Sequence, residues 1–382
     1  MVFGKVQVEF PSHMKKSDFY FPELDTLRFL AFLMVLVHHS PFWKSIEIWR
    51  TFSKYGWMGV DLFLCLSAFL FTRLLFVEFK ETGSVHIKNF YIRRAFRIWP
   101  LYFFFVILMA SLTIYQYGIN QQVVLRTLGL ATFTDDFLSA SDGYNTVILF
   151  SSHLWTISYE EQVYLVIPWL LRKLYQMKKM MVALLLTGMA LTGTITRAVM
   201  IYNNIDHPDI WVLPFTHFES VIGGILIGLG VFDDFLKRIP SILWLIVGII
   251  ALWQVTELPN VNEVQWKLML TYPLVGIGMS LIIYSVMQNG FWMLSNLMRN
   301  PITGYLGKIS YGLYVYHLLG VNIAYSIANR FVDPQRLLFH PASVLFLAFL
   351  ITTLLSAVSY QILERPFLRM KDRFTIIKSR PV

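Results

Sequence analysis

Residues 24–43 read LDTLRFLAFLMVLVHHSPFW, an apolar run that is long enough to cross a bilayer as a helix. The run contains Arg28, His38 and His39, and ionisable groups inside such a run are costly unless they face a cavity or a partner. This stretch therefore predicts a membrane-spanning helix with a buried polar site beside it.

The composition extends this interpretation to the whole chain of 382 residues. Apolar residues make up 56% of the sequence and charged residues only 14%, which is too little charge to cover a soluble protein of this size. We predict an all-α, polytopic bundle of about ten transmembrane helices that forms one integral membrane domain, residues 1–382, with no fused periplasmic domain. The predicted spans are 24–43, 57–77, 96–118, 150–171, 179–202, 214–232, 240–257, 266–287, 307–330 and 340–364. The apolar stretch 122–134 is too short to cross, and we expect it at an interface.

The distribution of charge orients these spans. The net charge is +9, and Lys and Arg lie on one side of the predicted spans by roughly three to one. The positive-inside rule places that side in the cytoplasm, so both tails, 1–22 and 366–382, are predicted to be cytoplasmic. Topology thus accounts for most of the excess charge, which argues against nucleic-acid binding. We expect a multi-pass protein of a bacterial cytoplasmic (inner) membrane, with no removable signal peptide.

Cys65 is the only cysteine, and it lies in an apolar run. One cysteine can form neither an internal disulfide nor a cysteine-rich metal site. We therefore interpret Cys65 as a small buried hydrophobe and predict no metal.

Polar residues of the first two spans lie at comparable depths. Arg28 and His39 are eleven residues apart, which is about three helical turns, so they share a face and lie about 16 Å apart along the axis. His38 points away from that face and is either packed near the outer interface or part of the site. We hypothesise that Asp61, in the outer half of the second span, pairs with His39 or Arg28. Ser67 lies deeper, and its hydroxyl either bonds to its own helix backbone or faces the site.

Three arginines open the third span in FYIRRAFRIWPLYF: Arg93, Arg94 and Arg97. Arg93 and Arg97 are four residues apart and share a helix face, with Arg94 beside them. Three guanidinium groups at a cytoplasmic helix mouth form either a phosphate site or a topology signal, and the residues alone leave both open.

The fourth and ninth spans also carry ionisable residues. HLWTISYEEQVYL places Glu160 and Glu161 about one-third of the way into the membrane. These carboxylates either serve the site or pair structurally with arginines. His153 shares a face with Glu160 because they are seven residues apart, and Ser310 and His317 of ISYGLYVYHLLG have the same spacing. The string ERPF, residues 364–367, ends the tenth span, and we interpret it as a structural helix stop.

Together these strings resemble the membrane-bound acyltransferase-3 family of integral membrane O-acyltransferases. The resemblance runs in order from residue 24 to residue 370, through LDTLRFLAFLMVLVHHS, GVDLFLCLSAFLFTRLL, FYIRRAFRIWPLYF, HLWTISYEEQVYL, ISYGLYVYHLLG and ERPFLRM. Residues 172–300 resemble the family mainly in hydropathy. The second motif usually reads Ser-Gly-Phe, whereas this chain has Ser67-Ala68-Phe69 and lacks the glycine that would allow a close backbone approach.

The resemblance implies an acyl-CoA co-substrate, most often acetyl-CoA, with no permanently bound cofactor. It also implies a carbohydrate or lipid-linked glycan acceptor, such as a polysaccharide or lipopolysaccharide. We expect the CoA phosphates at Arg93, Arg94 and Arg97, with the pantetheine arm running past Arg28 toward His39. His39 then acts as general base on the acceptor hydroxyl, because an imidazole with a pKa near about 6.5 suits that task at neutral pH. A covalent acyl-His39 intermediate is the alternative.

The remaining candidates take supporting roles in this scheme. Asp61 or Glu160 would fix the tautomer of His39 and stabilise its imidazolium. Glu161 is a further catalytic candidate, since the sequence leaves open which of the two glutamates faces the site. The predicted substrate-binding residues are His153, Trp155, Ser67 and His317. The oxyanion donor stays open among Arg28, Ser67 and backbone amides. Aspartates of the outer loops either bind sugar hydroxyls or belong to solvated acidic loops; they are Asp135, Asp136, Asp142, Asp206 and Asp209.

Two other classes of function are alternatives to an acyltransferase. A transporter or flippase would use intramembrane His, Asp and Glu as a proton relay. The sequence shows no inverted repeat and no paired broken helices, which argues against that class. A non-catalytic membrane scaffold would have no need of buried charge.

Overall fold

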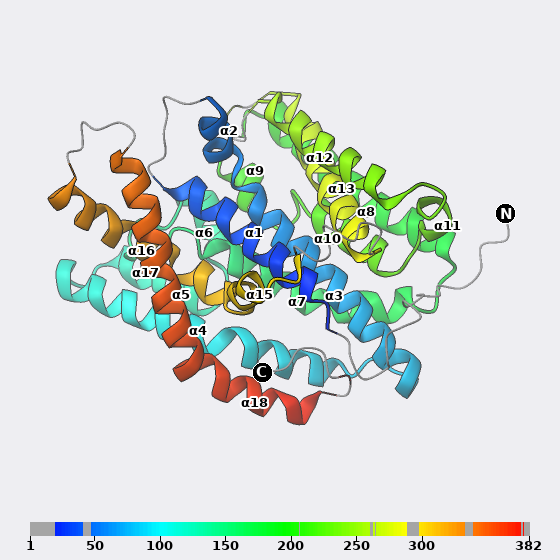
Figure 1. Ribbon diagram of the computed structural model, residues 1–382, viewed down its shortest axis with the longest axis horizontal. Coiled ribbons are helices and arrows are strands. Elements are labelled where there is room, and N and C mark those ends of the chain that lie inside the picture. The colour runs from blue at the N-terminus through cyan, green and yellow to red at the C-terminus, as the bar shows by residue number, and fades with distance from the viewer. Residues whose placement is uncertain are drawn as a thin grey trace.

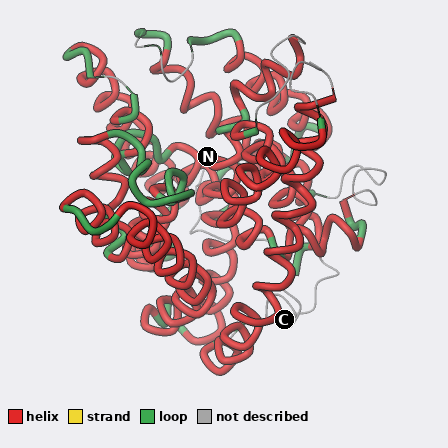
Figure 2. The backbone as a smooth tube through the Cα atoms, turned by 90° about the vertical axis from the view of Figure 1, so that its left-hand side faces the viewer, coloured by secondary structure: helices red, strands yellow, loops and turns green. Residues whose placement is uncertain are grey.

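The computed structural model is a bundle of helices (Figure 1). It describes residues 20–40, 47–205, 207–259, 263, 265–288, 298–332, 339–375 and 377. Within these ranges the chain forms helices, turns and loops and no strand, as Figure 2 shows. The all-α prediction is thereby confirmed for the described part of the chain. Most of the predicted cytoplasmic tail 1–22 lies outside the described residues.

The main helices follow the predicted spans, and each span overlaps one of them. They are α1 (Pro22–His39), α3 (Met58–Thr82), α4 (Ile87–Tyr117), α7 (Trp155–Leu174), α8 (Lys179–Tyr202), α10 (Glu219–Gly228), α12 (Ser241–Thr256), α13 (Leu268–Met287), α16 (Ser310–Phe331) and α17 (Phe339–Ser359). The short helices are α2 (Glu47–Tyr55), α5 (Gln121–Ala131), α6 (Asp135–Asp142), α9 (Asp209–Val212), α11 (Asp233–Leu236) and α15 (Pro301–Lys308). A π-helical turn, Tyr360–Glu364, joins α17 to α18 (Arg365–Lys371), and a 3₁₀ turn, Asp372–Phe374, follows.

Five helical segments in the described ranges are long and apolar enough to cross a bilayer: α3, α4, α8, α13 and the continuous segment His340–Phe374. The protein is therefore an integral membrane protein. α10 and α12 are apolar but shorter. α1 is polar for a span because Glu23, Asp25 and Arg28 lie in its 18 residues, and α7 carries Glu160 and Glu161. The residues that mark a candidate site are thus the ones that lower the hydropathy of these helices.

α3 lies at the centre of the bundle (Figure 1), in contact with α1, α7, α10 and α13. Its side chains enter separate hydrophobic clusters: Leu64 packs in one, Leu62 in a second, and Phe63 reaches the third. Cys65 is free and buried, as predicted. Ala68 occupies the position where a glycine was expected. The close approach of the two backbones is instead made possible by a glycine of the neighbouring helix, α10. A Cβ on Gly224 of α10 would lie 2.3 Å from the Cys65 carbonyl oxygen and 3.0 Å from the Ala68 Cβ.

Outer faces of the bundle carry large exposed apolar side chains. Leu184, Leu191 and Ile195 of α8, and Ile249 and Trp253 of α12, are each more than half exposed. Such continuous apolar faces on long helices are typical of contact with lipid acyl chains.

The segment around α5 and α6 is held by a buried polar cluster. Arg126 forms an ion pair with Asp135 at 3.3 Å, and the Gln162 Nε2 donates to both carboxylate oxygens of Asp136 at 2.9 and 3.0 Å. Both aspartates are fully buried. They are therefore neither solvated nor placed to bind a sugar, contrary to both sequence interpretations. Asp142 is exposed, and Asp206 lies outside the described residues.

Candidate functional site

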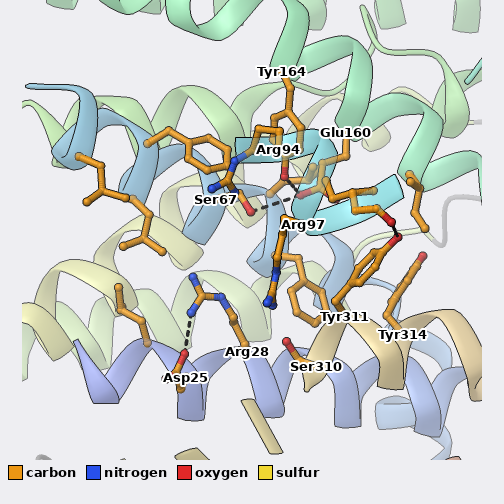
Figure 3. A pocket seen from close by; sticks show the side chains of 18 of the residues that line it. Asp25, Arg28, Ser67, Arg94, Arg97, Glu160, Tyr164, Ser310, Tyr311 and Tyr314 are labelled. Carbon is orange, nitrogen blue, oxygen red and sulfur yellow. Dashed lines mark hydrogen bonds and ion pairs between the residues drawn. The ribbon is translucent and has the colours of Figure 1, made fainter. Parts of the chain in front are cut away.

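A cavity of about 200 Å³ lies among α1, α3, α4, α7 and α16 (Figure 3). Predicted site residues from four of these helices line it together: Arg28, Ser67, Arg94, Arg97 and Glu160. Further residues line the cavity that the sequence patterns did not predict: Asp25, Thr156, Tyr164, Tyr311, Tyr314 and Lys371. Two of them could have been predicted from their positions in the sequence. Tyr314 lies three residues before His317 on the same helix face, and Lys371 directly follows the motif ERPFLRM.

Cations dominate the ionisable lining of the cavity. Four lining residues are cationic, Arg28, Arg94, Arg97 and Lys371, whereas two are carboxylates, Asp25 and Glu160. Arg28 donates from Nη1 to the Asp25 Oδ1 at 2.7 Å, across one turn of α1, and Figure 3 shows this pair at the cavity wall. The partner of Arg28 is therefore Asp25, and the predicted pairing of Arg28 with Asp61 is wrong.

The arginine triplet of α4 is divided between two places. Arg94 and Arg97 line the cavity, and the Arg94 guanidinium lies 4.5 Å from the Phe71 ring centroid. Arg93 instead pairs with Glu78 at 3.1 Å and donates to the Phe374 carbonyl at 2.9 Å. Two of the three predicted phosphate ligands thus face the cavity, while Arg93 lies in a smaller adjoining pocket that Arg94 and Lys371 also line.

Glu160 and Glu161 point in different directions. The Ser67 hydroxyl donates to the Glu160 Oε1 at 3.3 Å, and the Tyr164 hydroxyl donates to the same carboxylate. Glu161 accepts from the Trp99 Nε1 at 3.1 Å, away from the cavity lining. Glu160 is therefore the carboxylate that faces the site, and the Ser67 hydroxyl bonds to it rather than to its own helix.

The far end of the cavity is closed by Tyr314 and Thr156. The Tyr314 Oη lies 2.5 Å from the Thr156 Oγ1 and also donates to the His153 carbonyl at 3.3 Å. The Tyr314 ring centroid is 5.3 Å from that of His153 and 5.4 Å from that of His317. The side chain of Tyr314 therefore separates the cavity from a group of histidines.

That group joins three predicted residues from distant parts of the chain. The His39 Nδ1 lies 3.2 Å from the His317 Nε2 and 3.0 Å from the Val35 carbonyl oxygen. The His317 and His153 ring centroids are 4.5 Å apart, and both side chains are buried, whereas His39 is half-buried. No group of three or more His, Cys, Asp or Glu in the described ranges is arranged to hold a metal ion.

Three other candidates lie apart from the cavity lining. The Ser220 hydroxyl donates to Asp61 at 2.7 Å, so the predicted contact of Asp61 with His39 is also wrong. Trp155 packs edge-on against Trp211, with ring centroids 5.6 Å apart. The His38 Nδ1 lies 2.7 Å from a backbone carbonyl, that of residue 53, which agrees with the packed interpretation of His38.

A family model described as an acyltransferase domain matches residues 21–361. The chain belongs to this acyltransferase family. Similar proteins include a "Putative O-acetyltransferase" of Staphylococcus aureus (strain COL), 26% identical over 382 residues, and O-acetyltransferase OatA of S. aureus (strain NCTC 8325), 23% identical over 377 residues. These matches cover 95% and 92% of this chain but 59% and 57% of the relatives, so the chain spans a little over half their length. No solved structure matches the chain.

For an acyltransferase, two kinds of chemistry lie on the two sides of Tyr314. Arg28, Arg94, Arg97 and Lys371 offer N–H donors and positive charge to an anionic ligand. Beyond Tyr314, His39 and His317 offer imidazole nitrogens able to move a proton. An acyltransferase needs an acyl donor and an acceptor, and these two regions are where we look for them.

Proposed function

We propose that this protein is a membrane-bound O-acyltransferase that moves an acyl group, acetyl in the first place, from acyl-CoA to a hydroxyl of a carbohydrate or glycolipid. The observation that supports it most is the cavity that is lined by four cations and by Tyr314, whose ring packs against His317, the hydrogen-bonding neighbour of His39. The names of the relatives, O-acetyltransferases, support the acetyl group and the oxygen acceptor.

The cationic lining suits the donor. CoA carries its phosphates at one end and its thioester at the other, and guanidinium groups are the side chains best shaped for phosphate. In the proposal Arg94, Arg97 and Lys371 bind the phosphates from the cytoplasmic side, and the thioester extends past Arg28 toward Tyr314. The same orientation gives about ten spans with both termini in the cytoplasm of a bacterial inner membrane.

His39 acts as the general base in this scheme. Its free ring nitrogen removes the proton of the acceptor hydroxyl, and the acceptor oxygen attacks the thioester carbonyl carbon. The C–O bond forms, the C–S bond breaks, and the departing CoA sulfur takes the proton from the His39 imidazolium. His39 is half-buried at the C-terminal end of α1, which leaves it open to an acceptor on that side of the membrane.

The test uses the purified protein in detergent with radiolabelled acetyl-CoA and a series of glycan acceptors. We expect label transfer without any ion gradient, and its loss by about 10²–10⁴-fold in His39→Ala, the usual contribution of a general base. His38→Ala is the matched control, because His38 is the neighbouring histidine and bonds to a backbone carbonyl of α2. Full activity of His39→Ala refutes the base assignment. Gradient-dependent movement of the acceptor without label transfer indicates a transporter instead.

A further inference from the structure

The histidine pair His39 and His317 has a defined pattern of donors and acceptors. The His317 Nδ1 lies 2.5 Å from the Tyr314 carbonyl oxygen, while its Nε2 lies 3.2 Å from the His39 Nδ1. The His39 Nδ1 also lies 3.0 Å from the Val35 carbonyl oxygen. A carbonyl oxygen only accepts hydrogen bonds, so each ring nitrogen beside one must carry the hydrogen.

This requirement fixes the tautomer of both rings. His317 carries its hydrogen on Nδ1 because it bonds to Tyr314, so the Nε2 of the neutral ring holds a lone pair. His39 carries its hydrogen on Nδ1 as well, and shares it between Val35 and the His317 Nε2. The Nε2 of His39 is then left with its lone pair, in the state that a general base needs.

We propose that His317 is the positioning residue of this site: together with the Val35 carbonyl it accepts the Nδ1–H of His39, and so keeps the His39 Nε2 unprotonated for the acceptor hydroxyl. The inference rests on the proposed function. In this arrangement His317 also stabilises the imidazolium that forms when His39 takes the proton. The carboxylates expected in this role are committed elsewhere, Asp61 to Ser220 and Glu160 to Ser67 and Tyr164.

The surroundings of His317 suit a fixed acceptor. Its side chain is fully buried, its Nδ1 is bonded within its own helix, and the His153 ring packs at 4.5 Å against it. A second imidazole also avoids placing a permanent negative charge inside the bundle, where an ionised carboxylate is costly. The pair is therefore neutral at rest and gains charge only while His39 holds the transferred proton.

The test compares His317→Leu with His317→Gln in the label-transfer assay. Leucine fills much of the ring volume and accepts no hydrogen bond, whereas the glutamine side-chain oxygen reaches toward the position of the lost Nε2 and does accept one. We expect His317→Leu to lower kcat by about 10²-fold or more, within the range by which a misdirected general base lowers the rate. The KM for acetyl-CoA should stay near the wild-type value because His317 is not one of the residues that line the cavity. His317→Gln should recover at least about tenfold of the lost kcat, since the acceptor is restored.

A second readout reports on the tautomer directly. In protein labelled with ¹⁵N-histidine, the His39 Nε2 of the wild type should give the signal of an unprotonated ring nitrogen. His317→Leu leaves only the Val35 carbonyl, among the described residues, to accept the Nδ1–H, so a measurable share of the Nε2–H tautomer should appear, and His317→Gln should remove that share. Melting temperatures in detergent identify a variant that has not folded, in which case the glutamine variant and the NMR signal decide the question.

The outcomes separate this inference from the proposed function. If His39→Ala keeps full activity, the base assignment fails, and the positioning role fails with it. If His39→Ala is inactive while folded His317→Leu has wild-type kcat, only the positioning role is overturned. A folded His317→Gln with no more activity than His317→Leu, or a His39 tautomer that does not change in His317→Leu, overturns it as well.

Discussion

Gly307→Ala adds one methyl group where α15 crosses α1, beside the cavity. A Cβ on Gly307 would lie 1.9 Å from the Asp25 carbonyl oxygen and 2.4 Å from its carbonyl carbon, both backbone atoms of α1. Real Cβ atoms essentially never approach closer than 3.0 Å. The two helices must therefore separate by about 1.1 Å, the difference between these distances. α1 carries Arg28 and His39, so both ends of the proposed reaction path would move with it.

The magnitudes follow from this displacement. Overpacking a well-packed contact costs about 1–3 kcal/mol. The substitution also stabilises α15 by about 1 kcal/mol, because alanine is a better helix former than glycine. We therefore expect a small net loss of stability, about 0–2 kcal/mol, but a large loss of activity. A misplacement of about 1 Å in a catalytic arrangement lowers the rate on the order of 10²-fold.

Gly304→Ala, on the same helix α15, is the matched control, because a Cβ there meets no atom of the described residues within 4 Å. It should leave the rate unchanged and stabilise the protein by up to about 1 kcal/mol. The measurements are the initial rate of label transfer from acetyl-CoA and the melting temperature in detergent. If the two alanine variants have the same rate and the same melting temperature, the contact of α15 with Asp25 does not hold α1 as described.

Two further substitutions test other parts of the structure. Arg94→Gln with Arg97→Gln should raise the Kd for acetyl-CoA by about 10²- to 10⁴-fold, because each loses a charged hydrogen bond worth about 1.5–3 kcal/mol, and isothermal titration measures it. Arg93→Gln is the control, since that side chain pairs with a glutamate outside the cavity, and an equal loss of affinity in it would contradict this division of the triplet. Arg197→Met should destabilise the fold by about 3–5 kcal/mol, because it leaves Glu219, now 2.5 Å from the buried guanidinium, without its cation. Adding Glu219→Leu should restore most of the melting temperature, and no change in the single variant would exclude a stabilising role for the pair.

The sequence predicted the course of the helices well because a bilayer leaves few choices. Within a membrane the backbone must bond to itself, so each long apolar run folds as a helix. The predictions from sequence were wrong about where some helices begin and end. The third predicted span, 96–118, belongs to a helix that begins at Ile87, because hydropathy does not detect the polar first turns. Conversely, α10 is only ten residues long where residues 214–232 were predicted to span.

Within the site, the sequence could place residues on a helix face but not against a neighbouring helix. The shared face of Arg28 and His39 depends only on helical periodicity. The position of Asp61 in its apolar run also predicted its depth in the membrane. Depth does not determine the direction in which the side chain points. Asp61 turns toward Ser220, 159 residues away, and not toward α1. The contact between His39 and His317 joins residues 278 apart, and nothing in either string indicates it.

The charges in the cavity give a physical reason for its proposed ligand. The two carboxylates of the lining, Asp25 and Glu160, are fewer than its four cations, so the lining itself carries excess positive charge. Asp25 already bonds to Arg28 at 2.7 Å, and Glu160 accepts from Ser67 and Tyr164. Uncompensated charge of one sign inside a bundle is costly. A polyanionic donor such as acyl-CoA compensates this charge when it binds, and the neutral pair of His39 and His317 beyond Tyr314 adds no charge that would oppose it.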